Sequence, residues 1–357
     1  MTKQTLPHGL WHSPISPAML AGSIRLNDAQ WSPDGDFLVW SQSLDGKTSL
    51  FAKPAGDAAF DLSGEFNPSG GVGYGGGDFF AGQQGVVFAE RDGRLYFKPY
   101  GEGLARPITP MFGSCASPVI TPDERFVIYV HTYEGKDVLA IASLGGNAWP
   151  SILRQGADFF MQPTVSPDGK LLAWVEWDHP NMPWDGARLF LASIDAQTGS
   201  LGEARQLDGG EDIPVFQPVF SPDGSKLAWL SNEGELDQLR LLHLASGKLE
   251  TLTQDRVLLP PAWVQGIRAL AWSADSQQVY FRENQLGRIS LNAINTATRQ
   301  VSRVDTPPYT LIQQPCVSTK GELAFLAESA AKPPRVVRLL EGRAEVAARS
   351  QSDVLPV

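Results

Sequence analysis

A short turn motif that recurs along the chain limits the fold more than any other feature. Its clearest form is Ser-Pro-Asp-Gly, followed by an apolar run that ends in tryptophan. Seven copies, three of them clear, three weaker and the one at Ala81 degenerate, begin at Ser32, Ala81, Thr121, Ser166, Ser221, Ser273 and Ser318. They lie 40 to 55 residues apart. A repeat of that length predicts the blades of a β-propeller.

One repeat unit shows why the copies are β-structure. In residues 215–253, apolar runs at 215–220 and 226–230 flank the Ser-Pro-Asp-Gly turn, and further runs follow at 239–244 and 249–252. Proline fixes φ at the second turn position, aspartate accepts local hydrogen bonds and glycine tolerates positive φ. No helical periodicity interrupts the unit. The sequence therefore predicts an all-β chain, a seven-bladed β-propeller of four-stranded antiparallel blades.

The domain organisation follows from where the repeats begin and end. Residues 26–357 are predicted to form a single propeller, and residues 1–25 precede the first repeat. We expect this extension to pack on the outside of the ring. The last unit contains four predicted strands of its own, at 315–318, 322–327, 335–340 and 344–349. The ring would then close by packing of the last blade on the first, without a strand exchange.

Charge and cysteine content narrow the classes of partner. The chain of 357 residues carries a formal net charge of −10 and has no lysine- or arginine-rich run, so nucleic acid and anionic membrane are poor partners. No apolar stretch approaches the length of a membrane-spanning helix, and the N-terminus lacks the pattern of a signal peptide. The two cysteines, Cys115 and Cys316, are expected to be free thiols in a reducing, cytoplasmic compartment.

Several motif matches do not carry chemistry. Residues 71–76 satisfy G-x-G-x-x-G, but a strand-like segment follows where a nucleotide site needs a helix. No G-x-S-x-G, H-E-x-x-H or C-x-x-C occurs. Of the five histidines, His8 and His12 are four apart, but Gly9 and Pro14 argue against a helix there. We therefore predict no catalytic residue, no metal site and no cofactor in this chain.

One loop of the fourth blade stands out as a candidate binding surface. It connects predicted strands at 171–175 and 189–194 and is polar, aromatic and stiffened by two prolines. Its candidate substrate- or partner-facing residues are Glu176, Trp177, Asp178, His179, Asn181, Trp184 and Asp185. Tryptophan supplies contact area and the acids could hold a cation such as a free amino terminus. The alternative is a well-packed loop whose tryptophans cap the blade. In a four-stranded meander this loop lies on the face from which the last strand leaves, so any continuation beyond Val357 would begin there.

Three runs of the sequence resemble a known enzyme family. They are residues 9–16, residues 74–77 (Tyr-Gly-Gly-Gly) and residues 176–185 (Glu-Trp-Asp-His-Pro-Asn-Met-Pro-Trp-Asp). Together they are similar to the N-terminal propeller of prolyl-oligopeptidase-like serine peptidases, in the acylaminoacyl-peptidase and dipeptidyl-aminopeptidase branch. The resemblance marks Tyr74, Gly75 and Gly76 as secondary candidate residues. Two positions depart from the family: His8 replaces a frequent tyrosine, and Gly73-Tyr74 replaces a usual His-Glu-Tyr run.

The resemblance implies a function that the chain would perform together with a second domain. In that family an α/β-hydrolase domain carries the catalytic triad, and the propeller restricts access to short peptides. That domain is absent here, so the chain is expected to be a non-catalytic, substrate-gating part of a serine exopeptidase, inactive alone. The partners would be an α/β-hydrolase domain and short peptides. Two alternatives stay open: a TolB-like scaffold that binds a protein partner, and a metal-dependent, lactonase-like propeller.

Overall fold

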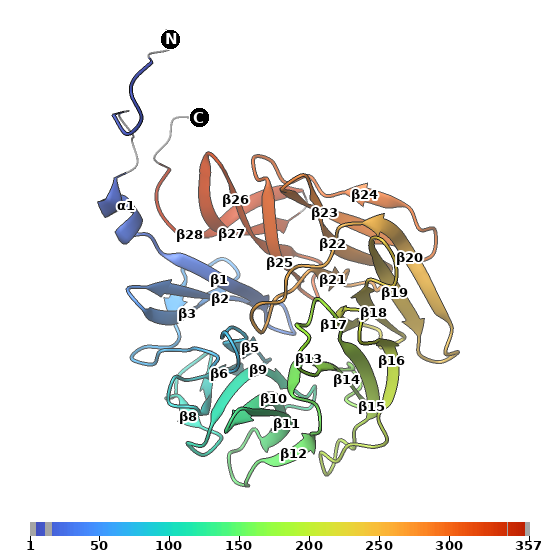
Figure 1. Ribbon diagram of the computed structural model, residues 1–357. Helices are drawn as coiled ribbons and strands as arrows, with labels where there is room; N and C mark the ends of the chain where they lie inside the picture. The colour runs from blue at the N-terminus through green and yellow to red at the C-terminus, as the bar shows by residue number, and fades with distance from the viewer. Residues whose placement is uncertain (1–4, 11–15, 341, 354–357) are drawn as a thin grey trace.

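Antiparallel strands make up nearly all of the regular structure. The computed structural model describes residues 5–10, 16–340 and 342–353, and in that part the chain forms one short helix and 28 strands (Figure 1). The helix, α1 (Pro17–Ala21), precedes the first strand. Within the described residues, no helix combines the length and the apolar character needed to cross a membrane.

The strands form successive groups of four, here called units 1 to 7. Units 1 to 4 are separate four-stranded sheets in which each strand pairs with the next one in sequence. Their strands are β1 (Arg25–Trp31), β2 (Phe37–Leu44), β3 (Lys47–Pro54), β4 (Phe60–Asp61), β5 (Phe79–Ala81), β6 (Gly85–Ala89), β7 (Leu95–Pro99), β8 (Arg106–Pro107), β9 (Ser114–Ile120), β10 (Phe126–Tyr133), β11 (Lys136–Ser143), β12 (Ser151–Arg154), β13 (Phe159–Val165), β14 (Leu171–Trp177), β15 (Arg188–Ser193) and β16 (Arg205–Gly209).

Units 5 to 7 repeat this arrangement. Unit 5 is a separate sheet, whereas units 6 and 7 are joined by a single parallel pair, Ile289 with Leu311. The strands are β17 (Val215–Phe220), β18 (Lys226–Ser231), β19 (Asp237–His243), β20 (Leu249–Arg256), β21 (Leu270–Trp272), β22 (Gln278–Gln285), β23 (Arg288–Asn295), β24 (Val301–Arg303), β25 (Leu311–Val317), β26 (Leu323–Ser329), β27 (Lys332–Leu340) and β28 (Arg343–Arg349). The prediction of an all-β chain of four-stranded, blade-like sheets is confirmed.

The recurring motif forms the turn between the first and second strands of a unit. In unit 5, Ser221 Oγ donates to Asp223 Oδ1 over 2.6 Å and accepts from the Lys226 amide over 2.9 Å. The same pair of hydrogen bonds recurs from Ser32, Thr121, Ser166 and Ser273. A hydroxyl and a carboxylate two residues later thus close the hairpin locally, which explains why the motif survives where its glycine does not.

A second repeat, in the first strands, was not predicted. Four residues that directly precede a proline have φ near +50°, and the strand pairing shifts register at each of them. These residues are Ser117, Gln162, Gln217 and Gln314. A residue in this conformation bulges the strand and redirects its side chain. Three of the four are glutamines, and the Gln217 backbone amide donates to Gln162 Oε1 over 2.7 Å.

The units are arranged around a common centre, and the last lies against the first (Figure 1). One buried apolar cluster combines residues of unit 1, such as Leu26 and Trp40, with Leu326 and Val336 of unit 7. The Ile24 amide also donates to Ser350 O over 3.1 Å. Units 1 and 7 are also linked by Gln314 with Asp28 and by Lys320 with Asp36, whereas β1 pairs in a sheet with β2 alone among the described strands.

The extension before the first repeat is described only in part. Residues 5–10 are exposed, and residues 1–4 and 11–15 lie outside the described residues. Most of the run at 9–16, on which part of the family resemblance rested, therefore cannot be placed. The packing of residues 1–25 on the outside of the ring stays a prediction.

Candidate functional site

The segment between units 5 and 6 crosses the middle of the molecule. We call residues 257–269 the strap. It leaves β20 and passes over to the glycine-rich run that leads into unit 2, where the Gln265 amide donates to Gly75 O over 2.8 Å and Gly76 forms a parallel bridge with Gln265 (Figure 1). A connection between neighbouring units thus reaches a unit on the far side of the centre.

Glycines allow this close approach. A Cβ atom on Gly76 would lie 2.4 Å from Gln265 O, and one on Gly77 would lie 2.6 Å from Ser117 Oγ. Both residues also have positive φ, a conformation that glycine adopts without steric cost. Of the secondary candidate residues, Gly75 and Gly76 therefore hold the strap through their backbones. The nearby G-x-G-x-x-G match leads into β5 and not into a helix, in agreement with its rejection as a nucleotide site.

The bulged side chains of the first strands fix the strap from several units. Their hydrogen bonds to it include Ser117 Oγ to Gln265 Oε1 (3.0 Å), Gln162 Nε2 to Ile267 O (3.0 Å) and Gln314 Nε2 to Gly266 O (3.1 Å). Gln265 in turn donates to Phe160 O over 2.8 Å. Units 3, 4 and 7 are therefore tied to one short segment, and the bulges place the polar groups that do so.

The strap ends in a buried ion pair with unit 1. Arg268 donates from Nη2 to Asp28 Oδ1 over 2.6 Å and from Nη1 to Asp28 Oδ2 over 3.2 Å. Asp28 also accepts from Gln30 and Gln314, so its two oxygens have several donors. The two-pronged geometry and the additional donors supply the hydrogen bonds that offset the desolvation of a buried ion pair.

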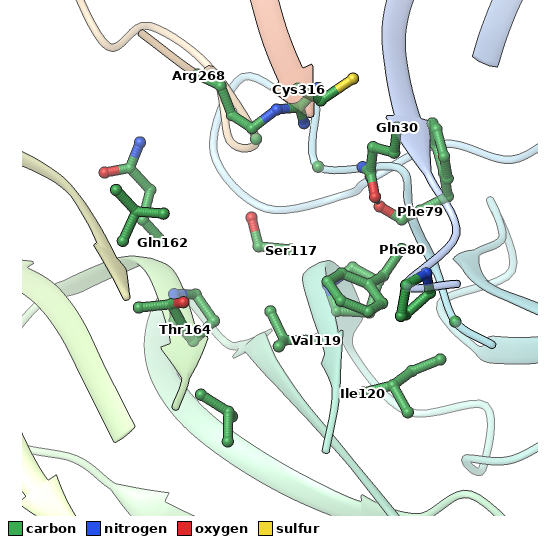
Figure 2. A pocket seen from close by; sticks show the side chains of 18 of the residues that line it. Gln30, Phe79, Phe80, Ser117, Val119, Ile120, Gln162, Thr164, Arg268 and Cys316 are labelled. Carbon is green, nitrogen blue, oxygen red and sulfur yellow. Dashed lines mark hydrogen bonds between the residues drawn. The ribbon is translucent and has the colours of Figure 1, made fainter. Parts of the chain in front are cut away.

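A cavity of about 560 Å³ lies on the turn side of the strap and is mainly apolar. We call it the proline-lined cavity, because prolines of four units surround it: Pro33, Pro118, Pro122, Pro163, Pro167 and Pro218. Figure 2 shows Gln162 and Thr164 facing Phe79 and Phe80 across it, with Arg268 at one side. Since Arg268 already binds Asp28, the exposed part of this cavity offers mostly carbon to a ligand.

A second cavity, of about 650 Å³, lies on the other side of the strap, and we call it the polar cavity. Its charged lining residues are Arg25, Asp28, Asp78, Arg282 and Glu328. Burial raises the pKa of Asp78 to about 6, against a hydrogen bond from the Gly70 amide that lowers it. The volume is typical of small-ligand sites. Both cavities share Gly266 and Ile267 as lining residues, so the strap separates them.

Exposed aromatic rings stand at the rim of the polar cavity. Tyr74, which lines the cavity, is 74% exposed, and Trp263 of the strap is 52% exposed. Their ring centroids are 6.0 Å apart, and Trp184 of the unit 4 loop lies 4.5 Å from Trp263. The structure thus brings together the predicted residues Tyr74 and Trp184 through a third aromatic that sequence reasoning missed.

The other predicted loop residues are used mainly inside unit 4. Strand β14 continues through Trp177, two residues further than expected, so Glu176 and Trp177 are not in the loop. Glu176 is 2% exposed because it pairs with Arg154 (2.9 Å) and accepts from the Trp174 indole (2.8 Å). Trp177 stacks on Phe159 at 5.2 Å. Glu176 is therefore buried where a substrate- or partner-facing residue was predicted, because its carboxylate pairs with Arg154 of β12 in unit 3.

The remaining residues shape the loop itself. Asp178 accepts from the Asp158 amide over 3.0 Å and pairs with Arg188. Asn181 donates to Glu211 O, and Asp185 accepts from the Met182 amide over 3.0 Å. His179 and Asp185 are exposed. Whether any of the seven predicted residues meets a ligand stays a prediction. Trp184 is the one that contacts an aromatic residue at the rim of the polar cavity.

Two further expectations concern metal and sulfur chemistry. In the described part of the chain, no group of three or more histidine, cysteine or acidic side chains could hold a metal ion. Cys115 and Cys316 are free, as predicted, and burial raises the pKa of each thiol to about 12. Thiols with such pKa values are protonated and unreactive at neutral pH.

Known peptidases share this arrangement of sheets. A puromycin hydrolase matches 97% of the chain with 26% identity and a TM-score of 0.85. A puromycin-hydrolyzing peptidase of Mycobacterium tuberculosis matches 99% of it with 24% identity and the same TM-score. Among curated proteins, dipeptidyl-peptidase 5 of Porphyromonas gingivalis is 21% identical over 81% of the chain. No protein-family model matches the sequence.

The chain is similar to the N-terminal propeller domain of prolyl-oligopeptidase-type peptidases. It spans 57% and 58% of the two hydrolases and 49% of dipeptidyl-peptidase 5, so the peptidase-type propeller accounts for about half of each relative. No catalytic domain falls within the matched half.

Proposed function

We propose that the chain is a closed seven-bladed propeller that acts as the non-catalytic, substrate-gating domain of a serine exopeptidase. Its catalytic partner would be an α/β-hydrolase domain, joined to it as in the peptidase relatives. The observation that carries this proposal is the position of the chain ends. Ile24 and Ser350 are hydrogen-bonded to each other, and their neighbours Arg25 and Pro334 line the polar cavity.

A second domain could therefore attach beside the polar cavity. A domain continuing from Ser350, or contacting the chain beside Ile24, would begin at the edge of the polar cavity and could cover it. The aromatic residues Tyr74, Trp263 and Trp184 stand at the same rim. Exposed aromatic groups next to a concave polar surface are typical of interfaces. The polar cavity would then face the catalytic centre and receive part of the substrate.

The strap sets the route by which peptides would arrive. It lies between the two cavities and is held by hydrogen bonds to units 2, 3, 4 and 7 and by the ion pair to unit 1. A peptide could pass along the centre of the propeller only if these bonds broke together. We therefore infer that short peptides enter from the side, between the propeller and the hydrolase domain, and that the propeller limits their size by closing the other end.

An activity assay of the chain alone tests the non-catalytic role. We expect no hydrolysis of aminoacyl- or acylaminoacyl-p-nitroanilide above the rate in buffer. Hydrolysis that a serine-directed inhibitor abolishes would overturn the proposal, because it would place a nucleophile within this chain. Retention of a cellular protein unrelated to hydrolases, in stoichiometric amount, would support a partner-binding scaffold instead.

A further inference from the structure

The buried and half-buried arginines of the described chain follow one rule with one exception. Eight of the nine form an ion pair with a carboxylate: Arg94, Arg154, Arg188, Arg240, Arg256, Arg268, Arg335 and Arg338. The ninth, Arg282, forms no ion pair and no side-chain hydrogen bond with any described residue. Desolvation of an unpaired cation is costly, so such groups are rare unless a ligand uses them.

Arg282 is also well placed for a ligand. It belongs to β22 of unit 6, where its amide donates to Ala269 O at the end of the strap, and its side chain lines the polar cavity. Burial lowers its pKa, with no carboxylate near enough to oppose that shift. A guanidinium remains charged under these conditions. The cavity therefore contains a desolvated positive charge that the protein itself leaves uncompensated.

We propose that Arg282 binds the carboxylate of a peptide in the polar cavity. A guanidinium offers parallel N–H donors that match the two oxygens of a carboxylate, and a partly dehydrated site strengthens that contact. The ring of Tyr74 and the backbone of Gly75 and Gly76 line the same cavity and give the rest of a short peptide an apolar and a polar wall. That the carboxylate belongs to a peptide rests on the proposed function, whereas the unpaired guanidinium does not.

The test measures peptide binding by the full chain, without catalysis. Tri-alanine with a free carboxylate is titrated by calorimetry against tri-alanine amide, which has the same side chains and no carboxylate. We expect the free acid to bind at least tenfold more tightly. Ala-Glu-Ala amide distinguishes a side-chain carboxylate from a terminal one: tighter binding of this peptide than of tri-alanine would assign the site to acidic side chains. Equal binding of the free acid and the amide, or no binding of any of these peptides, would overturn the site.

Variants identify the responsible arginine. Arg282→Met is expected to reduce the affinity for tri-alanine at least tenfold, and Arg282→Lys to keep part of it. Arg25→Met is the matched control, since Arg25 lines the same cavity but is exposed, and it should change the affinity less than threefold. Equal losses in the two Met variants would indicate general charge attraction and contradict the proposal. Inorganic phosphate serves as a competing anion: displacement of tri-alanine at equal concentration would show a general anion site and contradict carboxylate selectivity.

Thermal unfolding without peptide gives a second, independent readout. Removal of an uncompensated charge should raise the unfolding midpoint of Arg282→Met by about 2 °C. A lower midpoint would show that Arg282 has a structural partner and would contradict the proposal. Because both readouts use the chain alone, they stay informative if the proposed hydrolase partner proves wrong.

Discussion

At the scale of single residues, the most important feature at the centre of the molecule is the buried ion pair between Asp28 and Arg268. Asp28 receives both nitrogens of Arg268 and further donors from Gln30 and Gln314, and little of either charged side chain is exposed. Removing one member of such a pair leaves the other charge buried without a partner, which costs far more than the pair contributes.

We therefore expect Asp28→Ala to lower the free energy of unfolding by about 3 kcal/mol. Urea denaturation monitored by tryptophan fluorescence measures this change. The double variant Asp28→Ala/Arg268→Met should recover part of the loss, because it removes the orphaned cation as well. The control is Asp36→Ala, which breaks the exposed pair with Lys320 and should change stability little. Similar losses from Asp28→Ala and Asp36→Ala would contradict the account.

Asp78 makes stability depend on pH in the opposite sense from an ion-paired acid. Its folded pKa of about 6 lies above the ordinary value of 3.8, so the folded state binds the proton more tightly than the unfolded state. The contribution of Asp78 is most favourable below pH 4 and is lost as the pH rises through 6.

Asp78→Asn should therefore stabilise the chain relative to the wild type, and increasingly so at higher pH. The gain should grow by about 2 kcal/mol between pH 4 and pH 8, since asparagine keeps an oxygen for the Gly70 amide without the charge. Denaturation at the two pH values gives the difference. A gain that is the same at both would show that the carboxyl group titrates normally.

At the scale of elements, the strap is held by side chains of several units and, at the glycine-rich run, by backbone contacts. Gly76 and Gly46 have nearly the same φ, +80° and +79°, but a Cβ atom would lie 2.4 Å from Gln265 O at Gly76 and would meet nothing within 4 Å at Gly46. Comparison of the two positions therefore separates the cost of positive φ from the cost of steric overlap between a Cβ atom and its neighbours.

Alanine substitutions at these glycines test how closely the strap packs against Gly76. Gly46→Ala should cost about 1 kcal/mol from positive φ alone. Gly76→Ala should cost about 2 kcal/mol more, because backbone atoms must move. Hydrogen exchange should also show faster exchange of the Gln265 amide in Gly76→Ala only. Equal costs and unchanged exchange would mean that the strap is not packed against Gly76.

An element could be predicted from the sequence where the residues that determine it are close together in the chain. The hairpin turns were predictable, since a hydroxyl and a carboxylate two positions apart close each one. Strands such as β18 were recognisable because Leu227 to Leu230 form a continuous apolar run, and all four are buried. The bulges at Gln162, Gln217 and Gln314 left a signal, a repeated Gln-Pro pair, that was overlooked. The strap left no such signal in the sequence. Several of the residues that hold it, such as Gly75, Ser117 and Gln162, lie more than 100 positions away.

At the scale of the whole molecule, the same distinction separates the fold from the site. The repeat predicted four-stranded units, and the family resemblance predicted which peptidases share them. The polar cavity was predicted only at its rim, through Tyr74 and Trp184. Trp263 and Arg282 were missed, since neither lies in a motif. Trp263 stands out only because it contacts Tyr74 and Trp184, and Arg282 only because no described carboxylate pairs with it.

The coding frame beyond Val357 is the sharpest test of whether this propeller covers the active site of a hydrolase domain. We expect the frame to continue and to encode G-x-S-x-G followed by an aspartate and a histidine, the order found in α/β-hydrolases. A stop codon directly after Val357, with no hydrolase domain encoded on either side, would contradict it and would leave the polar cavity without a catalytic partner.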